Sequence, residues 1–262
     1  MIKTNYHTHT TRCKHAEGSD EEYVLAAIEA GLTEIGFSDH APWPKLPLET
    51  HQIRMDISEF EDYVQSIKRL QRQYAKRIKI NLGLEAEYYA DRMDFMKNLL
   101  TETPLDYLVF GNHFHLFEAR GHYYGNYSDS ANLLAHYEAD SINGLRTGLF
   151  KIFAHPDLFV RSLKEWNKDV ENMSRRIIQC AKEMNVVLEY NLGGIRNFSH
   201  LKMTYPSNQF WKIVAEEKAS VIIGVDAHSP QDLLDYNSVK NAETFLQSIG
   251  ITIIDGLDIQ TK

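Results

Sequence analysis

The sequence has few cysteines, no long apolar run and no excess of positive charge. Its two cysteines, Cys13 and Cys180, cannot form a disulfide framework, which is typical of a protein from a reducing compartment. No stretch of 18 apolar residues is present, and the first residues lack the apolar core of a secretion signal. We therefore expect a cytoplasmic protein without a membrane partner.

The charge balance argues against nucleic acid as a partner. The 262 residues contain 28 Lys and Arg against 36 Asp and Glu, a net charge of −8, and no basic run that would follow a phosphate backbone. Hydrophobic residues make up 43% and charged residues 24%, with only 14 Gly and 7 Pro, so disordered and collagen-like chains are excluded. The chain is long enough to bury a large core.

Short apolar or β-branched runs alternate with longer segments of helical period along the chain. Strands are expected at residues 2–8, 34–38, 78–84, 107–110, 150–154, 186–190 and 220–225. Helices are expected at residues 20–30, 58–76, 92–100, 132–147, 170–184, 207–217 and 239–248. No linker, repeat or charge block marks a boundary, so residues 1–262 are expected to form a single domain. About seven strand–helix units in one domain predict a barrel-like α/β fold.

The unusual feature is histidine, with twelve residues that are unevenly placed. Most of the candidate ligands come directly after predicted strands. They are His7, His9, His15, His40, Glu85, His113, His155, Asp226 and His228. Because the carboxyl ends of parallel barrel strands form one rim, we expect these side chains to converge. His7 with His9, and Asp226 with His228, have the i, i+2 spacing that points two side chains the same way in an extended segment.

Imidazole and carboxylate groups in this density suit Zn, Mn or Fe. Nine candidates exceed the three or four protein ligands of a single catalytic ion, so more than one ion is expected. Clustered ions can bridge a hydroxide, clamp a phosphate and neutralise the charge on a leaving oxygen. Hydrolysis of a phosphoester is therefore the expected chemistry.

Several neighbouring residues allow two interpretations. Glu87 points the same way as Glu85 on a strand. Of His113 and His115, only one need coordinate an ion. Cys13 is either a thiolate ligand or, as we favour, a buried thiol. The histidines off the strand-end pattern are expected at the surface, behind the ligands or in substrate loops, and they are His51, His115, His122, His136 and His200.

The motifs around these residues read His7-Thr-His9-Thr, Cys13-Lys-His15-Ala, Ser38-Asp-His40, Gly83-Leu-Glu85-Ala, Gly111-Asn-His113-Phe, Ala154-His155-Pro-Asp and Asp226-Ala-His228. Over nearly the whole chain, this pattern resembles the PHP (polymerase and histidinol phosphatase) superfamily. The Cys-x-His-Ala segment, the Gly-x-His-Phe form and the length are most similar to its monofunctional histidinol-phosphatase branch.

The resemblance implies a distorted seven-stranded (β/α) TIM-like barrel that holds three divalent metal ions, whose identity as Zn, Mn or Fe the sequence leaves open. His7, His9, Glu85 and Asp226 would hold the first ion. Glu85 would bridge to a second, held also by His113 and His155, while His15, His40 and His228 would hold the third. The implied reaction is hydrolysis of the phosphomonoester L-histidinol phosphate to L-histidinol and phosphate in histidine biosynthesis.

We expect a hydroxide shared by two ions to attack phosphorus in line. Glu85, Asp226 and His228 are the expected catalytic residues, with Asp226 or a histidine of the site assisting the leaving oxygen. Arg161 and Arg196 are candidates for phosphate binding, since guanidinium groups bind phosphate bidentately, although solvated surface positions are the alternative for each. Candidate partners for the substrate amine are Glu87, Asp157, Tyr123, Tyr124 and Tyr127.

Two other functions fit the same pattern. One is a phosphoesterase that acts on another phosphomonoester, a nucleotide or a nucleic-acid 3′ end, of which the polymer is disfavoured by the negative charge. The other is a non-catalytic metal-binding interaction module, which the complete set of candidate ligands disfavours. The oligomeric state is open.

Overall fold

The computed structural model describes residues 1–44, 53–117, 121–127, 132–198 and 203–259. Seven parallel strands form its main sheet in the order β1-β2-β3-β4-β7-β8-β9. Their bounds are β1 Thr4–Asn5, β2 Glu34–Phe37, β3 Lys79–Ala86, β4 Tyr107–Gly111, β7 Ile152–Ala154, β8 Val187–Asn191 and β9 Val221–Gly224. A parallel bridge between Thr8 and Ala227 links the two ends of the sheet. The sheet is therefore nearly closed, which confirms the predicted TIM-like barrel.

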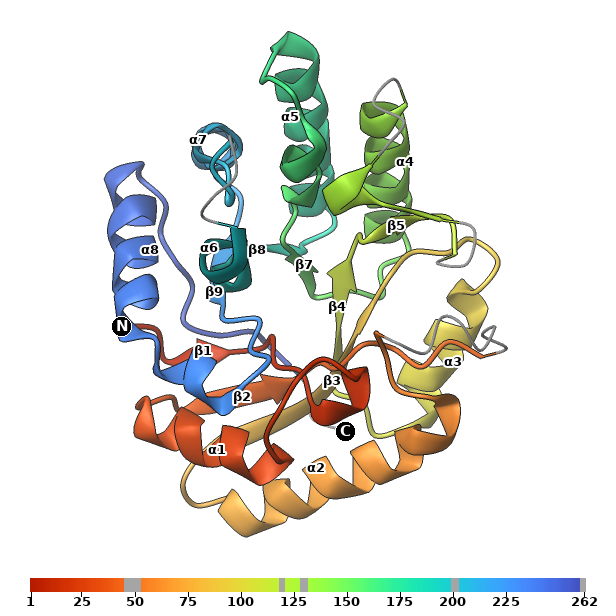
Figure 1. The fold of residues 1–262 in the computed structure, drawn as a ribbon, viewed down its shortest axis with the longest axis vertical. Helices are drawn as coiled ribbons and strands as arrows, with labels where there is room; N and C mark the ends of the chain where they lie inside the picture. Colours follow the sequence, from red (N-terminus) through yellow and green to blue (C-terminus); the bar gives the residue numbers. More distant parts are fainter. Residues whose placement is uncertain (45–52, 118–120, 128–131, 199–202, 260–262) are drawn as a thin grey trace.

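Helices surround these strands (Figure 1). Their bounds are α1 Asp20–Glu29, α2 Phe60–Tyr74, α3 Met93–Glu102, α4 Leu133–Arg146, α5 Lys168–Glu183, α6 Leu192–Phe198, α7 Asn208–Glu217 and α8 Tyr236–Ser248. The first helix begins with a capping box, because Ser19 accepts from the Glu22 backbone and the Glu22 carboxylate accepts from the Ser19 backbone. No helix among the described residues is both long and apolar enough to cross a membrane.

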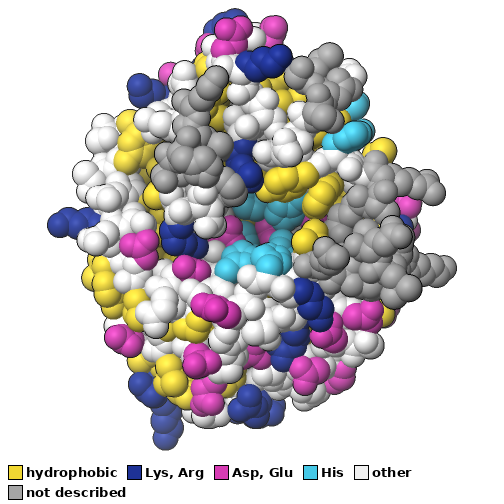
Figure 2. Space-filling view, viewed as in Figure 1, with side chains coloured by type: hydrophobic (Ala, Val, Ile, Leu, Met, Phe, Trp, Pro, Cys, Tyr) yellow, Lys and Arg dark blue, Asp and Glu magenta, His cyan; other side chains and the backbone are white. Residues whose placement is uncertain are grey.

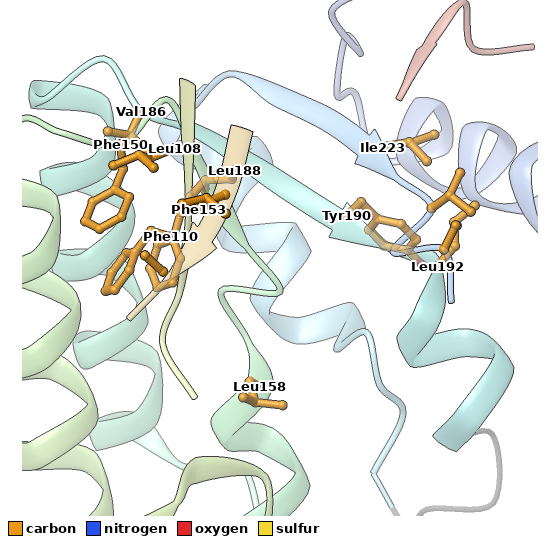
Figure 3. Packing of buried hydrophobic residues seen from close by; sticks show 14 of the residues in the cluster. Leu108, Phe110, Phe150, Phe153, Leu158, Val186, Leu188, Tyr190, Leu192 and Ile223 are labelled. Carbon is orange, nitrogen blue, oxygen red and sulfur yellow. The ribbon is translucent and has the colours of Figure 1, made fainter. Parts of the chain in front are cut away.

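The barrel strands separate two apolar clusters, since successive side chains of a strand point to opposite faces. In β4, Tyr107 and Val109 belong to a small interior cluster that also contains Ile152. Phe110 belongs to the larger cluster outside the strands, where its ring stacks on Phe153 with centroids 4.6 Å apart (Figure 3). Packing on both faces fixes the strand ends in place, and with them the side chains that follow.

Several local features differ from the expectation. Strand β1 covers only Thr4–Asn5, where a strand over residues 2–8 was expected. The predicted strand 78–84 continues to Ala86, so Glu85 lies inside β3 rather than after it. A short antiparallel hairpin, β5 Phe114–His115 and β6 His122–Tyr123, was not expected, because two-residue strands carry no period. Helix α6 was also missed, since Gly193 and Gly194 within it disfavour a helix.

Candidate metal centre

The carboxyl ends of the barrel strands bring all nine predicted ligands together. They surround a cavity of about 580 Å³, which eight of the nine line directly. His7 is buried beside it, with its Nε2 atom 3.1 Å from Nε2 of His9. Figure 2 shows a hollow with histidine side chains around it, acidic side chains at its bottom and hydrophobic side chains at its rim. The predicted convergence of the strand ends is thus observed.

Six of the histidines form three pairs in which the Nε2 atoms face each other. The Nε2 atoms are 3.1 Å apart in the pair His7 and His9, and 3.2 Å apart in the pair His113 and His155. The third pair, His15 and His228, has an Nε2 separation of 3.0 Å. The potential ligand atoms of this third pair and of His40 all lie within 4.8 Å of one another.

Glu85 lies between two of these pairs, with one carboxylate oxygen turned to each. Its Oε1 atom is 3.0 Å from Nε2 of His155 and 3.3 Å from Nε2 of His113. Its Oε2 atom is 3.5 Å from Nε2 of His7 and 3.0 Å from Nδ1 of His40. Burial opposes the charge, but the facing imidazoles hold the pKa of Glu85 well below its usual range, so the group is a carboxylate.

Asp226 faces the first pair from the end of β9. Its Oδ1 atom is 3.2 Å from Nε2 of His9 and 3.5 Å from Nε2 of His7, yet this buried oxygen has no hydrogen-bond partner among the described residues. The backbone of Asp226 has a φ of 52° and that of His155 a φ of 34°. Non-glycine residues adopt such left-handed angles at a cost, and they concentrate at functional sites.

Buried carboxylates also hold the far sides of the imidazoles. Glu189 Oε1 lies 2.8 Å from Nδ1 of His7, and Glu87 Oε1 lies 2.9 Å from Nδ1 of His113. Such contacts fix the tautomer and leave the Nε2 lone pair free for a metal. Glu189 is not among the residues predicted for the site, although a lone acidic residue inside an otherwise apolar predicted strand was a usable signal.

Two acidic candidates for binding the substrate amine do not line the cavity. Glu87 is buried between Arg54, the Trp43 indole and His113, with each contact at 2.9 Å. Asp157 is buried as well and accepts a 2.6 Å hydrogen bond from the Ser207 backbone, and burial raises the pKa of Asp157 to about 7. Neither carboxylate is among the cavity-lining residues.

Cys13 is fully buried close to the third histidine pair. With His9 and His228 it forms one of the groups whose potential ligand atoms lie within 4.8 Å of one another. Burial, however, raises the pKa of its thiol to about 12, which favours the neutral thiol over a thiolate ligand.

The histidines off the strand-end pattern lie elsewhere where they are described. His115 contacts Asp140 at 2.9 Å and stacks on His136 with ring centroids 3.8 Å apart, and neither histidine lines the cavity. Of His113 and His115, it is therefore His113 that faces the other candidate ligands. His122 is exposed on β6. His51 and His200 lie outside the described residues.

The two candidate arginines occupy different environments. Arg161 lines the cavity, and its Nη1 atom donates to the Tyr123 hydroxyl at 2.8 Å. Arg196 does not line it, and its Nη2 atom donates to the carbonyls of Val225 and Asp226 at 2.8 and 2.9 Å. Its buried Nη1 atom has no hydrogen-bond partner in the described part of the chain.

The fold and the histidine cluster define a class of protein, a parallel α/β barrel with imidazole and carboxylate groups gathered at the carboxyl end of its strands. The chain belongs to the PHP domain family, whose sequence model matches residues 5–192.

Two curated relatives match most of the chain. One is described as a probable histidinol-phosphatase from Deinococcus radiodurans and is 27% identical, covering 87% of this chain and 86% of its own. Another, from Schizosaccharomyces pombe and described in the same words, is 26% identical and covers 94% of this chain and 86% of its own. Among solved structures, the histidinol phosphate phosphatase of Lactococcus lactis, complexed with zinc, L-histidinol and phosphate, has a TM-score of 0.72 at 18% identity. That alignment covers 97% of this chain and 95% of the other and supports the shared fold.

Proposed function

We propose that this protein is a metal-dependent histidinol-phosphatase, which hydrolyses L-histidinol phosphate to L-histidinol and phosphate. The observation that carries the proposal is the arrangement of three facing imidazole pairs around the carboxylates of Glu85 and Asp226. The two curated relatives, each described as a probable histidinol-phosphatase, support the choice of substrate. So does the similar fold of the Lactococcus lactis enzyme, whose structure contains zinc, L-histidinol and phosphate.

The spacing of the imidazoles fits metal ligation. Two nitrogens that each lie about 2.0 to 2.1 Å from one ion, at angles between octahedral and tetrahedral, are roughly 2.8 to 3.4 Å apart. All three Nε2 separations, from 3.0 to 3.2 Å, fall within that range. The buried Oδ1 atom of Asp226 lacks a hydrogen-bond partner among the described residues. It is therefore a further atom that can coordinate an ion beside His7 and His9.

We assign one divalent ion to each imidazole pair. The first would be held by His7, His9, Glu85 and Asp226, and the second by Glu85, His113 and His155, so that Glu85 bridges both. The third would be held by His15, His40 and His228. The ligand set suits Zn, Mn or Fe, and zinc is present in the Lactococcus lactis structure.

When bound, such ions supply an activated water for in-line attack on phosphorus and neutralise charge on the phosphoryl oxygens. The protein's own residues then position the substrate. Arg161, which lines the cavity, binds phosphoryl oxygens through its guanidinium group. Arg196 does not line the cavity and acts on the site through its Nη2 atom, which holds the carbonyls of Val225 and Asp226. Asp226 and His228 both lie at the cavity wall. Either of them could take up the proton that the attacking water loses and pass it to the leaving oxygen.

The cavity wall outside the ligand cluster suits a planar ring on the leaving group. Its apolar and aromatic side chains are Ile53, Phe114, Tyr123, Leu158 and Tyr205. An imidazole ring can pack against aromatic faces of this kind. Among the described residues, the only carboxylates that line the cavity are Glu85 and Asp226, so the substrate amine has no separate acidic partner there.

The proposal is tested by phosphate release from a panel of substrates in the presence of Zn or Mn. We expect kcat/KM for L-histidinol phosphate to exceed that for p-nitrophenyl phosphate and for single-stranded DNA. A higher value for another phosphomonoester would overturn the substrate assignment and keep the phosphoesterase. No release from any substrate by the metal-loaded protein would contradict the enzymatic function and favour a metal-binding module.

A further inference from the structure

Glu189 is a buried carboxylate inside the barrel that the proposed reaction does not use directly. It lies in β8 between the interior positions Val187 and Asn191, and its side chain is 1% exposed. In the described part of the chain its only ionic partner is His7. A carboxylate that is buried at the base of a site without Lys or Arg is costly unless it has a defined task.

The two oxygens of Glu189 connect three separate parts of the site. Oε1 lies 2.8 Å from Nδ1 of His7, and Oε2 accepts from the backbone N–H of His155 at 3.2 Å. Oε2 also accepts from the Asn191 amide at 2.9 Å, and the same amide nitrogen is 3.1 Å from Oδ2 of Asp226. One carboxylate therefore contacts a ligand of the first proposed ion and the backbone of a ligand of the second.

Each of these contacts restrains the orientation of a candidate metal ligand. A carboxylate that accepts from Nδ1 of His7 keeps the proton there and turns the Nε2 lone pair toward His9. The His155 backbone has a φ of 34°, and the hydrogen bond from its N–H helps to hold that strained turn. The Asn191 amide passes the restraint on to the Asp226 carboxylate, whose other oxygen faces His7 and His9.

The neighbouring strand provides the space for this carboxylate. Gly224 in β9 lies opposite Asn191, and a Cβ atom built on it would fall 1.8 Å from Glu189 Oε1. Any residue other than glycine at position 224 would therefore displace the Glu189 side chain.

We propose that Glu189 is a positioning residue that sets the metal affinity of the first two ion positions and leaves the His15 and His228 position unaffected. The inference rests on the proposed function only in assuming that the cluster binds divalent cations. All three partners of Glu189 are hydrogen-bond donors in this arrangement, so an amide in its place leaves at least one contact repulsive.

The test measures zinc binding to metal-free protein by chelator competition, for the wild type, Glu189→Gln and Gly224→Ala. We expect both variants to lose about 10- to 100-fold in affinity at two positions, the range typical of removing a group that orients a metal ligand. The third position should bind zinc as in the wild type. Glu34→Gln is the matched control, since Glu34 begins β2 at the opposite end of the barrel and pairs with Lys79.

A second measurement distinguishes a positioning role of Glu189 from a contribution to folding stability alone. Nitrogen NMR of the ring of His7 in the zinc-loaded wild type should show the proton on Nδ1 and none on Nε2, and Gly224→Ala should shift the Nδ1 signal, because it disturbs the contact with Glu189. If both variants fold, bind zinc with wild-type affinity and keep the His7 tautomer, the proposal is wrong. If the wild type binds zinc but releases no phosphate from L-histidinol phosphate, the proposed function fails while the role of Glu189 stands.

Discussion

The replacement of Glu85 by glutamine gives the sharpest test of how the proposed metal ions would share their ligands. The side chain keeps its size, but one oxygen becomes an N–H donor that can no longer coordinate, and the other becomes an uncharged amide oxygen, which is a much weaker ligand than a carboxylate and cannot bridge two ions. In the structure, Oε1 faces His113 and His155 while Oε2 faces His7 and His40. The substitution is therefore expected to weaken two ion positions and to leave the one between His15 and His228 intact.

The expected losses of zinc affinity and of thermal stabilisation depend on how many ion positions the substitution affects. The loss of a group that only orients a ligand costs 10- to 100-fold in affinity, so the loss of the ligand itself should cost at least about 100-fold at each position. A factor of 100 corresponds to about 2.7 kcal/mol, or about 5 kcal/mol for two ions. Because bound ions stabilise the folded state, zinc should raise the Tm of Glu85→Gln by about 10 to 20 °C less than it raises that of the wild type.

Two assays measure this effect. Elemental analysis after dialysis at limiting zinc should find about one ion per chain in Glu85→Gln, and thermal unfolding with and without zinc should show the smaller rise in Tm. Glu34→Gln, which removes a strand carboxylate far from the cluster, should behave as the wild type in both. A full set of ions in folded Glu85→Gln would refute the bridging role.

Three further outcomes are expected. Tyr123→Phe removes the hydroxyl that accepts from Arg161 at 2.8 Å and should raise KM about 5- to 10-fold in steady-state kinetics, with metal content unchanged; an unaltered KM would dissociate Tyr123 from phosphate binding. Arg196→Ala should raise KM or lower kcat for phosphomonoesters, and wild-type kinetics would remove Arg196 from the site. Phe153→Ala deletes a fully buried ring that stacks on Phe110 and should lower the free energy of unfolding, measured in urea, by about 3 to 5 kcal/mol. A loss below about 1 kcal/mol would mean that the larger apolar cluster outside the strands is loosely packed.

The regular part of the fold follows from local patterns in the sequence. The apolar strands and amphipathic helices were predictable because each carries its own period, and the capping box at Ser19 marked a helix start correctly. The hairpin that presents Phe114 and Tyr123 to the cavity was not predictable, since its strands are two residues long and depend on tertiary contacts. Helix α6 contains two glycines that local propensity counts against it.

The candidate site shows the same division between local and long-range information. The convergence of the nine candidate ligands was predictable, because parallel strands end at one rim. The choice between His113 and His115 was not, since it depends on Asp140, a residue of α4 that lies 25 positions further along the chain. The tasks of Glu87 and Glu189 were also not predictable, because each depends on a histidine from another strand end.

The central claim is that three facing imidazole pairs hold three divalent ions. Anomalous X-ray diffraction at the zinc edge, from crystals of the zinc-loaded protein, tests it most directly. We predict three anomalous peaks, one beside each pair of Nε2 atoms, with Glu85 between two of them. A single peak, or peaks away from the Nε2 atoms, would contradict it.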